Sequence, residues 1–115
     1  MADLAIDRKA ENVVVVDLRE HSSYADFLVI ASGTSDRHVQ GIAEHVHSEV
    51  GKAGTHPIGS EGLREGQWAL VDFGSVVLHV FHEYSRQVYD LDGLWRTAPR
   101  LRLRTVEAAV VARRR

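Results

Sequence analysis

The clearest pattern in the chain is a pair of apolar runs, residues 68–73 and 76–81, separated by Gly74 and Ser75. A two-residue break with glycine in its first position is typical of a type II′ turn, so the two runs predict a β-hairpin. The second run is almost entirely apolar and rich in β-branched side chains, which indicates a strand covered on both faces. We therefore expect this hairpin to form the centre of the fold.

Three further segments have a regular pattern. Residues 13–18 begin with four valines and residues 27–31 are apolar throughout, so both predict buried strands. Between residues 37 and 53, apolar side chains recur at spacings of three and four, which predicts a helix with one buried face. Gly41 lies inside this helix at a cost in stability, so we expect it to allow close packing. A shorter amphipathic helix is expected within residues 2–11.

Turn residues mark where these elements begin and end. Gly33 permits a tight bend after the second strand, and Thr34 or Ser35 is placed to cap the first free N–H groups of the long helix. Residues 55–65 are rich in glycine and contain a proline. They predict a loop with a short edge strand near residues 57–59.

The segment after the hairpin mixes aromatic and charged side chains. Residues 87–91 alternate enough to predict a short final strand, and Asp92 is placed to cap a short helix that carries Leu94 and Trp95. Only one long crossover, through the helix at residues 37–53, joins two strands. The sequence therefore predicts an α/β fold with a mixed β-sheet and helices packed against it.

Length and composition are those of one globular domain. The chain has 115 residues, of which 44% are hydrophobic and 26% charged. No apolar run approaches the roughly 18 residues of a membrane span, and the first residues lack the basic start and apolar stretch of a signal peptide. The absence of cysteine excludes disulfides and thiolate metal ligands. We expect a cytoplasmic protein with no membrane association.

Charge is distributed unevenly along the chain. Residues 96–115 hold seven arginines and one glutamate, whereas residues 1–95 hold seven basic and fifteen acidic side chains, a net charge of −8. An acidic folded surface suits a basic partner or only keeps the protein soluble, and a basic tail binds nucleic acid or nothing in particular. The sequence thus predicts an acidic domain, residues 1–96, followed by an Arg-rich tail, residues 97–115.

A metal site is not expected from the histidines. His79 and His82 are three residues apart in a predicted strand, where they point to opposite faces. His38 and His45 share a helix face, but two helical turns separate them by about 10.5 Å, too far for one ion. We therefore predict no metal and no cofactor.

A nucleotide-binding or nucleotidyltransferase-type enzyme is the alternative that the residues leave open. The turn from Gly33 to Ser35 precedes a helix N-terminus, where backbone N–H groups bind anions. Asp90 and Asp92 have the spacing of two carboxylates on one strand face, as two-metal phosphoryl-transfer sites require. A helix cap and a strand end explain the same residues without any ligand. The glycine motifs of P-loop and dinucleotide-binding proteins are absent from the sequence.

Aromatic and charged side chains interleave in the hairpin region and beyond it. Tyrosine, tryptophan and arginine dominate the energetics of protein–protein contacts, although each can equally be a buried anchor. The side chains concerned are Trp68, Glu83, Tyr84, Arg86, Tyr89 and Trp95.

Several blocks of residues recur in one known family, in the same order and at the same spacing. They are Ala25-Asp26-Phe27, Ala31-Ser32-Gly33-Thr34-Ser35, Arg37-His38-Val39, Glu61-Gly62, Trp68, Asp72-Phe73-Gly74, Val77-Leu78-His79-Val80-Phe81, Glu83, Arg86, Tyr89-Asp90-Leu91 and Leu94-Trp95. On these blocks the chain resembles the ribosomal silencing factor family, also called iojap-like, over roughly residues 5–96. Asp36 departs from the family's usual serine, and the tail lies beyond the shared region.

The resemblance implies a nucleotidyltransferase-like fold without the transferase activity. It implies binding to the large ribosomal subunit at ribosomal protein fourteen, where the bound factor blocks joining of the small subunit and lowers translation when nutrients are short. Members of the family also form homodimers. Transferases of this fold carry an Asp-x-Asp about ten residues after the helix start, and no such pair follows Ser35 here, so we expect no enzyme activity.

The resemblance also directs attention to five side chains. The expected partner-binding residues are Trp68, Asp72, Glu83, Arg86 and Tyr89. The arginines of the tail suggest an additional weak contact with ribosomal RNA.

Overall fold

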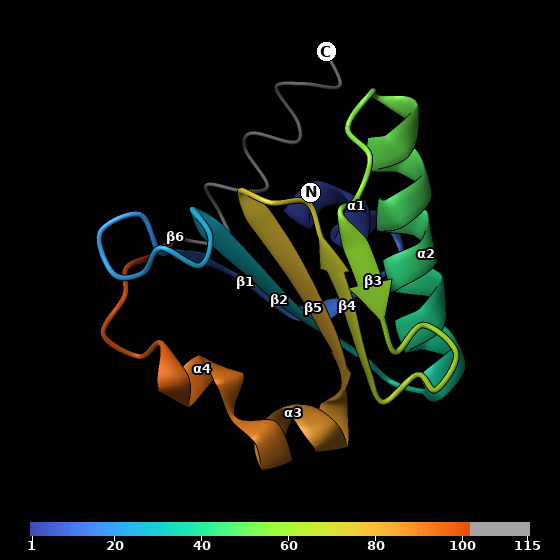
Figure 1. The fold of residues 1–115 in the computed structure, drawn as a ribbon. Helices are drawn as coiled ribbons and strands as arrows, with labels where there is room; N and C mark the ends of the chain where they lie inside the picture. Colours follow the sequence, from blue (N-terminus) through green and yellow to red (C-terminus); the bar gives the residue numbers. More distant parts are fainter. Residues whose placement is uncertain (102–115) are drawn as a thin grey trace.

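The computed structural model describes residues 1–101, which form a six-stranded sheet with helices on both of its faces (Figure 1). The strand order is β3-β4-β5-β2-β1-β6; β2 and β5 are parallel and the other neighbours are antiparallel. The predicted mixed sheet is confirmed. In chain order the elements are α1 (Ala2–Asp7), β1 (Glu11–Asp17), β2 (Phe27–Gly33), α2 (Asp36–Lys52), β3 (Gly59–Glu61), β4 (Trp68–Asp72), β5 (Val76–His82), α3 (Glu83–Tyr89), α4 (Leu91–Leu94) and β6 (Arg100–Leu101).

The β4–β5 hairpin forms where the sequence predicts it. Across the turn, the Phe73 N–H donates to the Val76 carbonyl over 3.0 Å, and Gly74 has a φ of +88°, which glycine adopts without strain. β5 lies between β4 and β2, and its residues from Val77 to Phe81 are buried. The expectation of a central strand covered on both faces is therefore confirmed.

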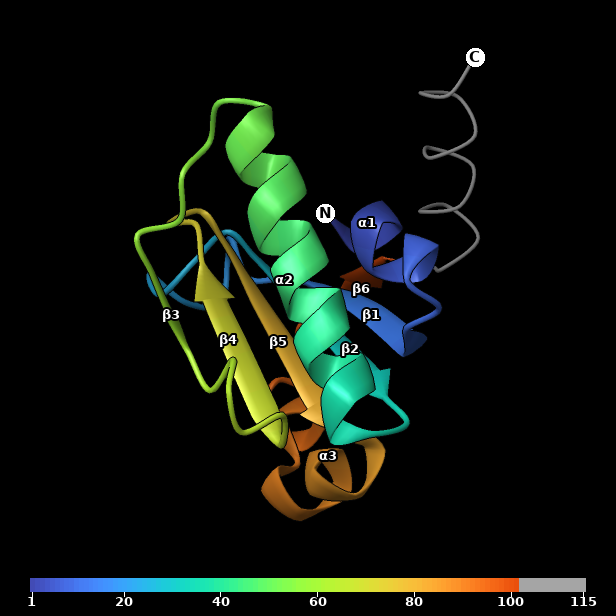
Figure 2. The same ribbon diagram turned by 90° about the vertical axis from the view of Figure 1, so that its right-hand side faces the viewer.

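Helix α2 matches the predicted long helix to within one residue at each end. The Ser35 hydroxyl accepts a hydrogen bond from the His38 N–H over 3.0 Å, so Ser35 is the N-cap. Together with α1, this helix covers one face of the sheet (Figure 2). Its buried side chains in the core on that face are Val39, Ile42, Ala43 and Val46.

The opposite face carries a second core, to which the segment after α4 contributes. Ala98 is buried there, and β6 pairs with β1, so the packed chain continues to Leu101. The predicted tail contact with RNA falls mainly on residues 102–115, outside the described residues. Within the described chain, none of the helices is long and apolar enough to cross a membrane.

The chain after β5 differs from the prediction. Residues 87–91, expected as a strand, form the end of helix α3, its cap Asp90 and the first residue of α4. The His82 ring caps this helix by accepting from the Tyr84 N–H over 3.2 Å, and the Ser85 hydroxyl donates to the Gln67 side chain over 2.9 Å. A five-residue alternation is a weak signal, and these contacts from outside it favour a helix.

The cap of the next helix was also predicted at the wrong residue. Asp90, not Asp92, caps α4, because the Asp90 carboxylate accepts from the Gly93 N–H over 3.1 Å. Asp90 has a left-handed backbone (φ 48°), a conformation that aspartate tolerates better than most residues. The Asp92 carboxylate is engaged elsewhere, by Arg86.

Gly41 does not allow a close approach between elements. A Cβ built there would meet no atom within 4 Å, so the expectation of tight packing is wrong. Gly62 is the opposite case, since its φ is +73° and a Cβ would lie 2.0 Å from the Trp68 carbonyl oxygen.

This contrast gives a matched pair of substitutions. Gly41→Ala should raise the free energy of unfolding by about 0.5–1 kcal/mol, because it restores helix propensity at no steric cost. Gly62→Ala should lower it by at least about 2 kcal/mol, through left-handed strain and the backbone clash. Urea denaturation followed by circular dichroism measures both. Equal effects of the two substitutions would contradict this account of the glycines.

Candidate functional site

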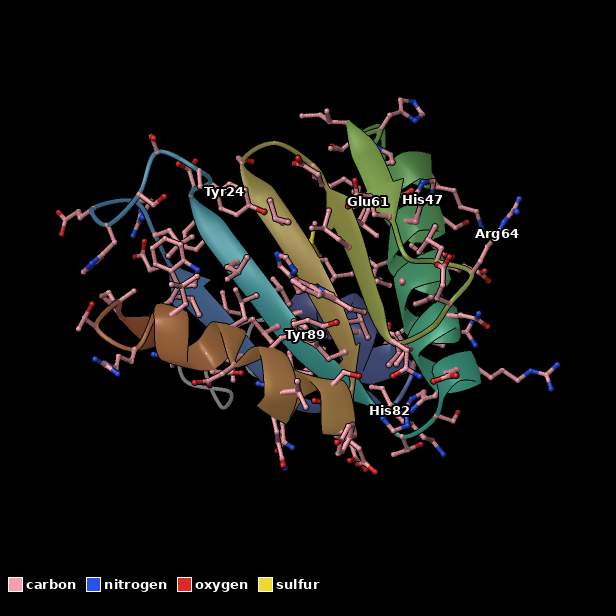
Figure 3. All side chains as sticks on the ribbon, turned by 60° about the horizontal axis from the view of Figure 1, so that its bottom comes forward. Tyr24, His47, Glu61, Arg64, His82 and Tyr89 are labelled. Carbon is pink, nitrogen blue, oxygen red and sulfur yellow. The ribbon has the colours of Figure 1, made fainter. Side chains whose placement is uncertain are left out.

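The sheet face opposite α2 is covered only in part. Leu91, Trp95 and Ala98 pack against the core over β1 and β2. Over β4 and β5, by contrast, Trp68 is only half-buried and Tyr89 is 57% exposed. Figure 3 shows Tyr89 on the side of α3 that faces these strands, and Tyr24 at the far end of the same sheet face.

Four rings from β4, β5 and α3 form an aromatic cluster, Trp68, His79, Phe81 and Tyr89, with Trp68 at its centre. The Trp68 indole stacks on Phe81 with ring centroids 4.8 Å apart, because the hairpin register places these residues opposite each other. The Tyr89 ring centroid lies 4.7 Å from that of the indole, and the two ring planes are inclined to each other. An anchored, half-exposed tryptophan beside a tyrosine is a typical energetic centre of a protein–protein interface.

His79 is a buried member of this cluster and is only 4% exposed. Its Nδ1 accepts a hydrogen bond from the Trp68 indole N–H over 2.9 Å. Burial lowers the pKa of His79 to about 4, although the negative charge of Asp72 opposes the shift. The ring is therefore neutral at neutral pH.

Sequence reasoning considered His79 only as a metal ligand and missed this contact. The signal that would have found it is the hairpin register. A two-residue turn pairs Trp68 with Phe81, so that His79, two residues before Phe81 on the same strand face, lies diagonally opposite Trp68.

A recess of about 290 Å³ opens beside the indole. Its lining residues are Glu61, Gly62, Trp68 and Leu70. Glu61 is exposed and contributes a negative charge next to an otherwise mainly apolar wall.

The two predicted acidic residues flank the aromatic cluster without joining it. Asp72 lies on the same sheet face as Trp68, four residues further along β4, which corresponds to about 13 Å. It is half-buried, and its carboxylate accepts from the Gly74 N–H over 2.8 Å. Glu83 is exposed in the first turn of α3, on a different side of that helix from Tyr89.

The fifth predicted residue, Arg86, is turned inward, and its side chain is 12% exposed. Its guanidinium donates to both carboxylate oxygens of Asp92 over 3.0 and 2.9 Å, to the Asn12 carbonyl over 2.6 Å and to the Ser32 hydroxyl over 2.9 Å. Its hydrogen bonds hold the pKa of the Asp92 carboxyl below its usual value. Arg86 thus ties α3 to α4, β1 and β2.

The features that suggested nucleotide chemistry have structural roles. Asp90 is a helix cap and Asp92 pairs with Arg86, so the prediction of two carboxylates on one strand face is wrong; this segment is not a strand. At the turn before α2, the Thr34 N–H donates to His38 Nδ1 over 2.9 Å. Among residues 1–101, no group of three or more histidine, aspartate or glutamate side chains is arranged to hold a metal ion.

The buried imidazole makes stability dependent on pH. The unfolded chain binds a proton at His79 near pH 6.5 but the folded chain only near pH 4, so acid favours unfolding. The contribution is fully present above pH 6.5, and about 3 kcal/mol of unfolding free energy should be lost as the pH falls to 4. Urea denaturation at several pH values should show a smaller loss in His79→Asn. Equal losses in the two proteins would refute the assignment.

The inward contacts of Arg86 predict that lysine cannot replace it. Arg86→Lys keeps the charge but loses the bidentate pair with Asp92 and the hydrogen bond to the Ser32 hydroxyl. The free energy of unfolding should therefore fall by about 2 kcal/mol. The exposed Arg64 provides the control. Arg64→Lys should change stability by less than about 0.5 kcal/mol. If thermal unfolding gave the two variants the same midpoint, the role assigned to Arg86 would be wrong.

Comparison with known proteins finds one matching family model and several similar proteins. The family model described as ribosomal silencing factor during starvation matches residues 1–115. A Bacillus subtilis protein named ribosomal silencing factor RsfS is 40% identical over 93 residues, which cover 81% of this chain and 79% of that protein. A more distant mouse protein, named mitochondrial assembly of ribosomal large subunit protein 1, is 31% identical over 98 residues, covering 83% of this chain and 43% of the mouse protein.

A solved structure shares the fold. The crystal structure of a protein from Chromobacterium violaceum is similar with a TM-score of 0.79 and 34% sequence identity, over 81% of this chain and 78% of that one. The α/β architecture expected from the sequence is thereby confirmed. Since the family model spans the chain and a relative at 40% identity covers most of it, this protein belongs to the ribosomal silencing factor family.

Proposed function

We propose that this protein binds the large ribosomal subunit at ribosomal protein fourteen and blocks joining of the small subunit, which represses translation when nutrients are limited. Membership of the family supports a role on the ribosome in starvation, and the name of the mouse relative supports the large subunit as target. The observation that carries the proposal is the half-buried Trp68, which packs against both Phe81 and Tyr89 on the partly covered sheet face.

The proposed contact surface has an aromatic centre and acidic surroundings. Trp68 and Tyr89 would bury their rings against the partner, and Asp72 and Glu83 would meet basic side chains of the partner around them. The recess beside Trp68, with Glu61 at its edge, suits the aliphatic stem and charged end of a lysine or arginine. Arg86 would act indirectly, by holding α3 and therefore Tyr89 in place.

Charge favours a protein target over RNA for this domain. Residues 1–95 carry a net charge of −8, so ribosomal RNA repels them and a basic ribosomal protein attracts them. Complementary charge accelerates the encounter and makes binding sensitive to salt. The Arg-rich tail, which is positively charged, would in contrast be attracted to ribosomal RNA and add a weak contact with it.

The mechanism is steric and needs no chemical step. The described chain measures about 32 × 32 × 26 Å, and a body of this size on the joining face keeps the two subunits apart. We therefore propose a non-enzymatic protein that acts without a cofactor. From the resemblance we also propose that it is a homodimer when free and acts in the cytoplasm.

Purified ribosomal subunits test the proposal directly. Excess protein should reduce the fraction of assembled ribosomes in a sucrose gradient. Trp68→Ala should weaken binding to large subunits about a hundredfold and Tyr89→Ala at least about tenfold, because both belong to the proposed energetic centre. Both variants should lose the effect on subunit joining at concentrations where the unchanged protein acts.

The same helix provides a control. Tyr84 is 71% exposed on α3, so Tyr84→Ala removes as large a ring as Tyr89→Ala and should leave binding unchanged. Circular dichroism must show that all variants are folded. Assembly of ribosomes to the same extent with and without excess protein would disprove the proposed function.

A further inference from the structure

His79 is the one titratable side chain in the interior of the described chain, residues 1–101. It lies on β5, opposite Leu70 of β4 and Ile30 of β2, on the sheet face that carries Trp68. An apolar side chain would fill this position more simply, because burying an imidazole carries a desolvation cost. The contacts of the ring therefore need an explanation.

The two ring nitrogens of His79 are in different situations. Nδ1 accepts the Trp68 indole N–H over 2.9 Å, and since indole can only donate, Nδ1 carries no proton. The proton of the neutral ring is then on Nε2. That atom is buried and has no hydrogen-bond partner within the described part of the chain. The structure thus tolerates one unpaired donor while Nδ1 is used.

The surroundings of Trp68 show what Nδ1 supplies. Stacking on Phe81 at an interplanar angle of 28° holds the plane of the indole, but stacking alone allows the ring to turn over or slide within that plane. A directional hydrogen bond to the indole N–H selects one orientation. In that orientation Tyr89 packs against the indole, and the recess lined by Leu70 opens beside it.

We propose that His79 is a positioning residue of the partner-binding surface, whose Nδ1 fixes the orientation of the Trp68 indole so that it meets the partner already ordered. The inference rests on the proposed function, because it assigns a role within that surface. An anchor ordered before binding loses less conformational entropy on association, and so binds more tightly for the same contacts.

Burial keeps this acceptor available at physiological pH, because it lowers the pKa of His79 to about 4. Asp72, on β4, is the charged group whose field acts on the ring, and its charge opposes this shift without cancelling it. The paired residue of β2, Ile30, is apolar, and α3 contributes the uncharged Tyr89 to the cluster. Nδ1 therefore stays unprotonated across the range in which the protein would work, and His79 serves as a fixed acceptor and not as a switch.

Two substitutions of His79 distinguish the effect of the hydrogen-bond acceptor from the effect of the side-chain volume. Asparagine places its side-chain oxygen close to the position of Nδ1, whereas leucine fills a similar volume without an acceptor. The measurements are the solvent exchange of the Trp68 indole N–H by NMR, assigned with Trp68→Phe, the free energy of unfolding, and the affinity for purified large ribosomal subunits.

We expect His79→Leu to remain folded but to exchange the indole proton at least about tenfold faster and to bind subunits about tenfold more weakly. His79→Asn should restore both properties, although its packing is poorer than that of leucine. If leucine prevents folding, His79→Gln, which moves the acceptor one bond further from the strand, replaces it and should lose affinity relative to asparagine.

The outcomes distinguish this inference from the function on which it rests. If Trp68→Ala weakens binding while His79→Leu, or Gln in its place, binds as tightly as the unchanged protein, the positioning role is wrong and the proposed function stands. If Trp68→Ala itself binds normally, the proposed surface is wrong, and the role of His79 within it fails too. A loss of affinity in asparagine as large as in leucine would also overturn the inference.

Discussion

The pairing of Trp68 with Phe81 across the β4–β5 hairpin is the interaction on which the candidate surface depends. Side chains alternate along a strand, so a slip of one residue would turn Trp68 toward α2, where Ala69 and Val71 now fill a close-packed core. The two-residue turn at Gly74 prevents that slip by fixing the register. With this register Trp68, His79 and Phe81 share one face, and the cluster can form.

The two faces of the sheet are covered to different extents. α1 and α2 cover one face with a continuous apolar layer, which accounts for much of the buried core. The other face is covered by side chains from α4 and the segment after it, and only over part of its width. The remaining part leaves Trp68 half-buried, so that part of its apolar ring area stays accessible. This difference between the faces suits a domain that is proposed to bind the large ribosomal subunit and block subunit joining.

The short helices α3 and α4 depend on polar contacts more than on apolar ones. Arg86 joins them to each other and to the ends of β1 and β2, and the Ser85 hydroxyl joins α3 to the Gln67 side chain just before β4. Helices of four and seven residues are not stable alone, so these contacts decide their position. The orientation of Tyr89 is therefore set by the polar contacts of its neighbours on α3, Ser85 and Arg86.

The amino-acid sequence by itself determined the elements whose signals are local. The long helix, the two N-terminal strands and the hairpin follow from periodicity, β-branched runs and turn residues, and the mixed sheet follows from their order. Trp68 was also identified from the sequence, as a large aromatic residue in a matching family block.

Only the tertiary structure decided how the segment after the hairpin folds and what its polar residues do. Residues 87–91 have too short a pattern to choose between strand and helix, and contacts from distant residues such as Gln67 settle the choice. The inward turn of Arg86 cannot be read from the sequence alone. The hairpin register places His79 near Trp68, but only the tertiary structure shows that the two side chains form a hydrogen bond. Whether a polar side chain faces a partner or its own chain depends on which groups the fold brings within hydrogen-bonding distance.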